Sequence, residues 1–165
     1  MDIIQYHIDS PCGSLYLVAS DKGLRGIHWR KQPGPVIQTL NSAKPAHKIL
    51  NITALQLREY FAGQRKNFDV PLDLDWGSSF QRRVWKELSR IPFGQTASYK
   101  DIAKRINNPK AVRAVGSANG RNPFSIIVPC HRVIAADGSM GGYGGGLPAK
   151  RVLLTLENKH AMTKI

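Results

Sequence analysis

The chain has 165 residues, enough for one compact domain or two small subdomains, and its 42% apolar content excludes wholesale disorder. No stretch is apolar over the roughly 18 residues that a membrane span needs, and the first residues lack the pattern of a secretory signal, so we expect a cytoplasmic protein. The formal net charge is +13, and residues 77–165 carry +11 of it, which predicts a polyanionic partner for the second half.

The first half of the chain predicts a small unit of sheet and helix. Three β-rich segments separated by short turn sequences predict an antiparallel meander: residues 3–9, 13–20 and 24–30. A proline-rich loop over 31–47 leads into a helix predicted over 46–62, which ends at Gly63. Residues 68–76 are expected to be extended, and Pro71 favours a sheet edge or an irregular connection there.

The second half predicts mainly helices. Four segments carry apolar residues at helical spacing or signals for helix starts: residues 78–91, 98–106, 110–120 and 148–159. Ser98 with Asp101 three residues later is typical of a capping box. The segments 98–106 and 110–120 are joined by a brief turn, and the latter is basic. This pair predicts a helix-turn-helix.

An unusual local sequence follows the third of these helices. Residues 126–128 predict a short buried strand that ends at Pro129, and a cysteine, a histidine and an arginine come directly after it: Cys130, His131 and Arg132. A thiol is mostly protonated at neutral pH, and a nearby cation or base raises its reactive fraction. From the residues alone Cys130 is either a nucleophile or an inert buried side chain, and both readings stay open.

The second cysteine, Cys12, lies between Pro11 and Gly13 in a predicted turn and is expected to be a small filler. Two cysteines are too few for a disulfide framework. No pair of Cys or His has the spacing of a structural zinc site, so we expect no bound metal.

Four segments in the second half carry a family resemblance: FQRRVWKELSRIPFGQTASYKDIAKRI, KAVRAVGSANGRNP, VPCHRVI and GSMGGYGGGLPAKRVLLTLE. In this order and at this spacing they resemble the O6-alkylguanine-DNA alkyltransferases. The resemblance covers residues 78–158 nearly continuously and the N-terminal half only loosely.

The resemblance implies an α+β protein with two parts. Residues 1–76 would form a small α/β subdomain with an antiparallel, ribonuclease H-like sheet. Residues 77–165 would form a mostly helical domain with a winged-helix-like helix-turn-helix, which binds DNA and carries the alkyl acceptor.

The implied activity is direct repair of alkylated DNA. The protein would bind double-stranded DNA through the minor groove as a monomer, flip out an O6-alkylguanine and move the alkyl group irreversibly to its own cysteine. The resemblance implies no cofactor. It leaves open whether O4-methylthymine is accepted and whether binding along DNA is cooperative.

The resemblance also assigns roles to the cysteine and to four other residues. Cys130 matches the acceptor, and His131 matches the histidine that takes the thiol proton through a water. Glu157 matches the acid that orients this histidine. Asn122 matches a member of the hydrogen-bond network, and Tyr99 matches the tyrosine whose hydroxyl faces the flipped base.

The expected DNA-binding residues lie on or next to one predicted helix: Arg113, Ala114, Gly116, Ser117, Ala118 and Arg121. Among them Arg113 matches the arginine that fills the place of the extruded nucleotide. Small residues keep this helix slim, which suits a minor groove about 6 Å wide.

The expected pocket wall is glycine-rich and contains Tyr143, Gly144 and Gly145. Two positions depart from the pattern of some family members: Gly144 replaces a serine, and Ser125 replaces a proline. These departures leave the range of alkyl adducts open.

Three other functions remain as alternatives. A non-catalytic sensor of alkylated DNA would lack the acceptor, and the presence of Cys130 argues against it. A helix-turn-helix regulator would read a specific sequence in the major groove, and a Cys-His hydrolase would turn over more than once.

Overall fold

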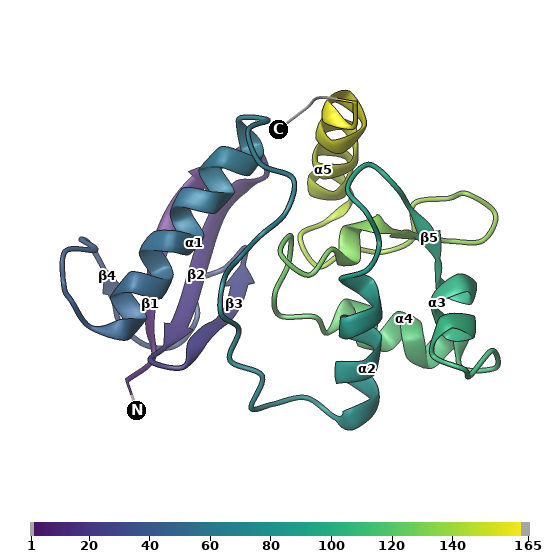
Figure 1. Cartoon of the computed structure of the whole chain (residues 1–165), viewed down its shortest axis with the longest axis horizontal. Coiled ribbons are helices and arrows are strands. Elements are labelled where there is room, and N and C mark those ends of the chain that lie inside the picture. The colour runs from purple at the N-terminus through teal and green to yellow at the C-terminus, as the bar shows by residue number, and fades with distance from the viewer. Residues whose placement is uncertain (1, 163–165) are drawn as a thin grey trace. The chain divides into compact units, whose positions relative to one another are not determined.

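The computed structural model describes residues 2–162. Their contacts divide the chain into two compact units, and the boundary along the sequence lies between Trp76 and Gly77 (Figure 1). The first unit is a sheet with one long helix, and the second is mainly helical. This confirms the expected α+β class. Among the described residues, no helix is both long and apolar enough to cross a bilayer.

The sheet of the first unit contains the predicted antiparallel meander, with strands β1 (Ile4–Ser10), β2 (Gly13–Ser20) and β3 (Gly23–His28). A short strand, β4 (Val36–Ile37), pairs in parallel with β1, so the order is β3-β2-β1-β4. The sequence predicted a loop there. The buried amide of Gln5 holds this segment, donating to the carbonyls of Gln32 and Gly34 at 2.6 and 3.1 Å.

Helix α1 (Pro45–Phe61) lies along the sheet and contacts β1, β2 and β3 (Figure 1). Its first residue is a proline, whose fixed φ suits the first turn of a helix. Leu50, Ala54 and Leu57 are fully buried and supply its core-facing stripe. Gly63 follows the helix with φ 76°, as the predicted stop requires. The helix therefore begins and ends within a residue of its prediction.

The chain after α1 runs beside β3. Leu24 N–H donates to Pro71 C=O, and Asp73 N–H donates to Leu24 C=O, both at 2.8 Å. Pro71 thus serves as an acceptor at a sheet edge, where its missing N–H costs nothing. A Cβ on Gly23 would lie 2.7 Å from the backbone of Leu72 and Asp73, so only glycine permits this close approach.

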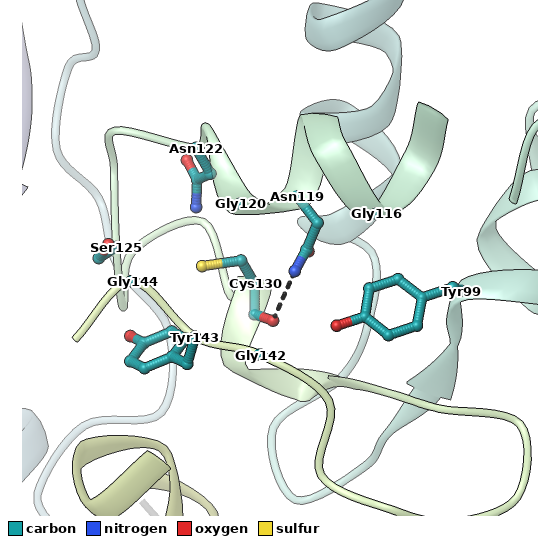
Figure 2. A pocket seen from close by; sticks show the side chains of 10 residues that line it. All are labelled: Tyr99, Gly116, Asn119, Gly120, Asn122, Ser125, Cys130, Gly142, Tyr143 and Gly144. Atoms are coloured by element: carbon teal, nitrogen blue, oxygen red, sulfur yellow. Dashed lines mark hydrogen bonds between the residues drawn. The ribbon is translucent and has the colours of Figure 1, made fainter. Parts of the chain in front are cut away.

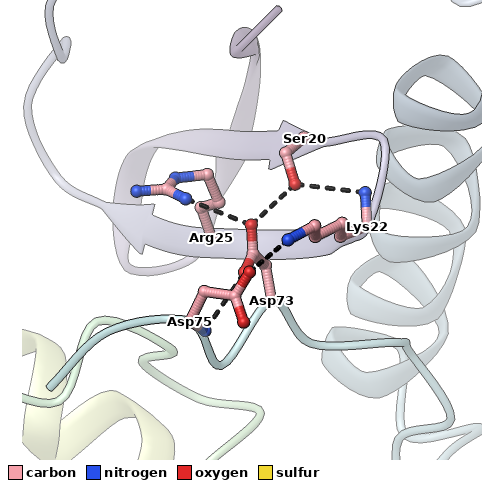
Figure 3. A network of polar contacts seen from close by, with 5 residues as sticks. All are labelled: Ser20, Lys22, Arg25, Asp73 and Asp75. Carbon is pink, nitrogen blue, oxygen red and sulfur yellow. Dashed lines mark hydrogen bonds and ion pairs between the residues drawn. The ribbon is translucent and has the colours of Figure 1, made fainter. Parts of the chain in front are cut away.

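The carboxylate of Asp73 fastens this connection to the sheet (Figure 3). Its Oδ2 accepts from Ser20 Oγ at 2.7 Å and from Arg25 Nη1 at 3.1 Å, and its Oδ1 accepts from Asp75 N–H at 3.2 Å. Burial alone would raise the pKa of Asp73, but these hydrogen bonds and the Arg25 charge outweigh it, and the pKa is lowered. Asp73 therefore stabilises the fold in its ionised form.

We expect Asp73→Ala to lower the free energy of unfolding by about 1–3 kcal/mol, because it leaves a buried hydroxyl and a guanidinium without their acceptor. The contribution of Asp73 is present above its unfolded pKa of 3.8 and is lost as the pH falls through its lower folded pKa. Urea unfolding at neutral and acidic pH measures both effects. The control is Asp75→Ala, which removes an exposed pair with Lys22 and should cost less than about 1 kcal/mol. Equal losses for the two variants would contradict this role of Asp73.

The second unit contains the four predicted helices: α2 (Ser79–Leu88), α3 (Tyr99–Arg105), α4 (Val112–Gly120) and α5 (Leu147–His160). Ser78 and Ser98 cap α2 and α3, each in a complete capping box with Gln81 and Asp101. Helix α2 ends three residues earlier than its apolar pattern predicted. Pro92 disfavours helical backbone in the residue before it and so limits the helix on that side.

Helices α2, α3 and α4 pack against one another. Trp85 on α2 is buried, and its Nε1 donates to the carbonyl of Ala118 on α4 at 2.8 Å. Its ring forms a T-shaped contact with Phe124, at 6.4 Å between centroids. Helices α3 and α4 follow one another across a short turn, and α4 is linked to the segment that carries the cysteine by a hydrogen bond from Asn119 to the carbonyl of Cys130.

Ile126 and Val128 are buried, as predicted, and Ile127 is half-buried, but the segment forms a turn and not a strand, so the strand prediction was wrong. Asn122 explains the difference, because its side chain takes backbone partners that a strand would need. Its Oδ1 accepts from Phe124 N–H at 3.0 Å, and its Nδ2 donates to Val128 C=O at 2.8 Å. Ile126 has φ 76°, which is unusual for a β-branched residue and incompatible with a strand.

Candidate active site

The cysteine begins a short 3₁₀ turn, η1 (Cys130–Arg132), which leads into β6 (Val133–Ile134). Strand β6 pairs in parallel with β5 (Ala97–Ser98), at the start of α3. A 3₁₀ helix has three residues per turn, so successive side chains point about 120° apart. Cys130 and His131 therefore project in different directions although they are neighbours in sequence.

A pocket of about 370 Å³ opens beside this turn (Figure 2). It is lined by residues of α3 and α4, of the turn segment and of the glycine-rich loop before α5: Tyr99, Gly116, Asn119, Gly120, Asn122, Ser125, Cys130, Gly142, Tyr143 and Gly144. In Figure 2 the sulfur of Cys130 points towards Asn122 and Ser125 and away from Tyr99. Cys130 is only 4% exposed, so a reactant must reach it through this pocket.

The buried thiol is protonated at rest. Burial raises the pKa of Cys130 to about 11, although hydrogen bonds from Asn122 and Ser125 and the charge of Lys150 act in the opposite direction. The sequence left open whether Cys130 is a nucleophile or an inert thiol, and named a nearby cation or base as what would raise its reactive fraction. In this pocket the proton must leave as the sulfur reacts, and the site needs a base.

His131 has the properties of that base. It is fully buried, and its Nε2 lies 2.8 Å from Glu157 Oε2. Burial lowers the pKa of His131, and the charges of Arg132 and Lys150 add to the effect, so the imidazole is neutral near pH 7 in spite of Glu157. Nδ1 has no hydrogen-bond partner among the residues that the structure describes. With Nε2–H donating to the carboxylate, Nδ1 carries the lone pair that can accept a proton.

Glu157, on α5, is ionised. Burial alone would raise its pKa, but hydrogen bonds from His131 and Arg132 and their charges lower the pKa to about 2. Arg132 grips the carboxylate with two hydrogen bonds, from Nε to Oε1 at 2.7 Å and from Nη2 to Oε2 at 2.9 Å. The sequence analysis assigned Arg132 no role, although its place directly after the Cys-His pair was a signal.

Lys150, also on α5, fastens the wall of the pocket. Its ammonium group is buried and donates to the carbonyls of Val133, at 2.7 Å, of Gly142, at 3.2 Å, and of Met140. These bonds tie the glycine-rich loop to the helix behind it. The sequence analysis missed Lys150, because only the tertiary fold brings these carbonyls together.

Tyr99 contacts the same loop from α3. Its hydroxyl is hydrogen-bonded to the backbone of Gly142, and burial together with the nearby Cys130 raises its pKa, so it remains a neutral donor. Gly141 has φ 66°, and a Cβ there would lie 2.7 Å from the Tyr99 hydroxyl. The glycine is therefore required for the tyrosine to lie against the loop. In contrast, a Cβ on Gly144 would meet nothing within 4 Å.

The structure brings most of the predicted catalytic and pocket residues together. Tyr99, Asn122, Tyr143 and Gly144 line the pocket with Cys130, while His131 and Glu157 form the buried pair next to it. The edge of the His131 ring faces Tyr143, at 6.4 Å between centroids. The pocket lining also includes Asn119, whose Nδ2 donates to Cys130 C=O at 3.5 Å and which was not predicted. Gly145 is not among the lining residues.

The residues predicted to bind DNA divide into two groups. Four are exposed on or beside α4: Arg113, Ala114, Ser117 and Arg121. Gly116 lines the pocket, and Ala118 is buried against Trp85. Ala118 therefore packs the helix onto α2 and is not available to a partner. Within residues 2–162, no group of three or more His, Cys, Asp or Glu is placed to hold a metal ion.

Curated relatives cover nearly the whole chain. A methylated-DNA–protein-cysteine methyltransferase of Mycolicibacterium paratuberculosis is 47% identical over 160 residues, which are 96% of this chain and 95% of the relative. The protein of the same name from Methanosarcina acetivorans is 46% identical over 149 residues, which are 90% of this chain and 94% of the relative.

Solved structures agree with these relatives. The crystal structure of Mycobacterium tuberculosis O6-methylguanine methyltransferase has a TM-score of 0.82 at 43% identity, covering 99% of this chain and 97% of that one. The structure of Mycobacterium tuberculosis OGT in complex with DNA has a TM-score of 0.83 at 45% identity, covering 95% and 94%.

The family comparison assigns both halves of the chain. Residues 3–74 match the family described as "6-O-methylguanine DNA methyltransferase, ribonuclease-like domain". Residues 79–159 match "6-O-methylguanine DNA methyltransferase, DNA binding domain". The chain, with its cysteine, histidine and glutamate assembled beside one pocket, therefore belongs to the 6-O-methylguanine DNA methyltransferase family.

Proposed function

We propose that this protein is a methylated-DNA–protein-cysteine methyltransferase, which repairs O6-alkylguanine in DNA by moving the alkyl group to its own Cys130. The observation that carries the proposal is the position of this thiol, which lies at a pocket and next to a neutral, buried His131 held by Glu157. The names of the relatives and the DNA complex of the mycobacterial protein support the same substrate and partner.

The transfer is a displacement at the alkyl carbon. The sulfur of Cys130 forms a bond to this carbon as the bond from carbon to O6 breaks, and the electron pair of that bond stays on the purine. The thiol proton passes to Nδ1 of His131, through a water, and Glu157 stabilises the imidazolium that results. The Tyr99 hydroxyl donates to the purine and offsets its developing charge.

The product explains why each chain would act only once. Transfer converts the thiol into a thioether, which has no acidic proton and is a poor leaving group. None of the residues around Cys130 supplies a nucleophile of comparable strength to remove the alkyl group. The protein would therefore be consumed in proportion to the lesions that it repairs.

The base must leave the duplex to meet this thiol, because the pocket encloses Cys130 and an O6-alkyl group lies inside the base stack. We assign the contact with the minor groove to α4, where small residues such as Ala114 permit close approach. Arg113 is exposed on this helix and would fill the space of the extruded nucleotide. The charge of +11 on residues 77–165 favours binding to the phosphate backbone.

Intact-mass spectrometry tests the proposal. After incubation with an excess of a duplex that contains O6-methylguanine, the mass of each chain should rise by one methyl group and no further. A duplex of the same sequence with unmodified guanine is the control and should leave the mass unchanged. An unchanged mass with the lesion duplex would refute alkyl transfer. Release of product beyond one equivalent without an adduct would point to a hydrolase.

A further inference from the structure

The carboxylate of Glu157 accepts hydrogen bonds from His131, the proposed base, and from Arg132. His131 Nε2 and Arg132 Nη2 both reach Oε2, at 2.8 and 2.9 Å, and Arg132 Nε holds Oε1 at 2.7 Å. All three residues are buried, with at most 6% of their surface exposed. The arginine thus binds both carboxylate oxygens and shares Oε2 with the histidine.

The guanidinium is held in place independently of Glu157. Its third nitrogen, Nη1, donates to the carbonyl of Ile91 at 2.7 Å. Its central carbon lies 5.7 Å from the centre of the Phe93 ring, within the range of a cation–π contact. Both residues belong to the segment after α2, so the core of the second unit sets the position of Arg132.

This arrangement decides where the positive charge beside Glu157 resides. Arginine is charged at every relevant pH, so Arg132 balances the buried carboxylate without a proton from solvent. If Arg132 were absent, the carboxylate would lose the permanent charge that balances it, and a buried carboxylate favours a protonated neighbour such as His131 strongly. A histidine that is already protonated cannot accept the proton of the thiol.

We infer that Arg132 is a positioning residue for alkyl transfer, which holds both oxygens of Glu157 and thereby keeps His131 neutral and able to act as the base. The inference rests on the proposed function and adds a residue to its machinery. In the transfer step Arg132 neither gains nor loses a proton. Its effect is to leave Glu157 enough attraction to orient His131 but too little to protonate it.

The other groups near His131 do not replace Arg132 in balancing the charge of Glu157. The groups that contact its ring or shift its protonation come from η1, from α5 and from the loop before α5: Arg132, Lys150, Glu157 and Tyr143. The segment after α2 contacts Arg132 through two uncharged groups, the carbonyl of Ile91 and the ring of Phe93. Lys150 donates to three backbone carbonyls, and the hydrogen bonds described for Glu157 come from His131 and Arg132.

The test compares the pH dependence of transfer in three proteins. The single-turnover rate with saturating O6-methylguanine duplex is measured for the wild type, Arg132→Lys and Arg132→Gln. The wild-type rate should fall only below pH 6.5, because the pKa of His131 is lowered from that value. In Arg132→Gln this fall should move upward by about 1 pH unit or more. Lysine keeps the charge but not the two-pronged grip, so Arg132→Lys should lie between the two.

A second measurement tests the inference even if one of the variants loses activity or stability. NMR titration of the His131 imidazole without DNA should give the same order of pKa values, lowest in the wild type. If Arg132→Gln does not fold, the wild type and Arg132→Lys still decide the matter. The matched control is Arg90→Gln, at an exposed arginine paired with Glu87, and it should not shift the profile.

The outcomes separate this inference from the proposed function. A wild type without transfer at any pH would overturn the function itself. Normal transfer in the wild type, with the same pH profile and the same His131 pKa in both Arg132 variants, would overturn only the role of Arg132. A shift to lower pH in Arg132→Gln would also overturn it, because the predicted sign would be wrong.

Discussion

Cys130→Ser should lose alkyl transfer entirely and retain its affinity for duplex DNA. A serine hydroxyl is a far weaker acid than a thiol. A neutral imidazole such as His131 is too weak a base to take the hydroxyl proton and so generate an oxygen nucleophile that attacks an alkyl carbon. The side chains are similar in size, so the pocket and the basic surface remain. The expected result is no methyl adduct on the variant after prolonged incubation with the lesion duplex, measured by intact mass.

A measurement of DNA affinity and a control at the second cysteine make this prediction specific. Fluorescence anisotropy with a labelled duplex should give equal affinities for Cys130→Ser and the wild type at one salt concentration, because phosphate contacts dominate binding. Cys12→Ser is the matched control and should transfer at the wild-type rate. Burial raises the pKa of the Cys12 thiol to about 11, and it does not line the pocket. Full transfer by Cys130→Ser would exclude Cys130 as the acceptor.

Glu157→Ala should strongly destabilise the second unit. The side chain is 1% exposed and holds His131 and Arg132 through three hydrogen bonds, so its removal leaves a buried guanidinium without a counter-charge. Breaking such a pair by removing one partner costs about 3–5 kcal/mol. Urea unfolding at pH 7 measures the loss. Transfer should fall as well, because His131 loses the group that orients it.

The pH dependence gives this prediction a second signature. The pKa of Glu157 is lowered from 4.5 to about 2, so its stabilising effect is present above pH 4.5 and is lost as the pH falls towards 2. The difference in the free energy of unfolding between the wild type and Glu157→Ala should therefore decrease over that pH range. Glu59→Ala, which breaks the partly exposed pair with Arg65, is the control and should cost less than about 1 kcal/mol. If Glu157→Ala also cost less than about 1 kcal/mol, the stabilising role of the buried network would be contradicted.

Local signals in the sequence were sufficient for most of the fold. Capping serines at 78 and 98, Gly63 and turn residues between the strands act within a few positions along the chain, so they predict helix ends and hairpins well. The failures involve contacts between distant positions. Strand β4 depends on the buried amide of Gln5, about thirty residues earlier, and the predicted strand at 126–128 is replaced by a turn that Asn122 holds.

The candidate site likewise contains some features that the sequence predicted and others that depend on contacts between distant positions. Cys130 and His131 were evident because they are adjacent, and the family resemblance supplied Glu157 and Tyr99. Neither route indicated how far burial raises the pKa of the thiol, or the parts played by Arg132 and Lys150, which follow from the groups they contact in the fold. Interpretation of the motif gave the reacting groups, and the structure gave the charges that control them.

Peptide mapping of the reacted protein is the most direct test of where the alkyl group goes. The wild type is mixed with one equivalent of O6-methylguanine duplex and digested, and the peptides that contain Cys12 and Cys130 are sequenced by tandem mass spectrometry. The methyl group should be found on Cys130 alone, in proportion to the guanine restored. Restored guanine with the methyl group on Cys12, on His131 or on no residue of the chain would contradict the mechanism.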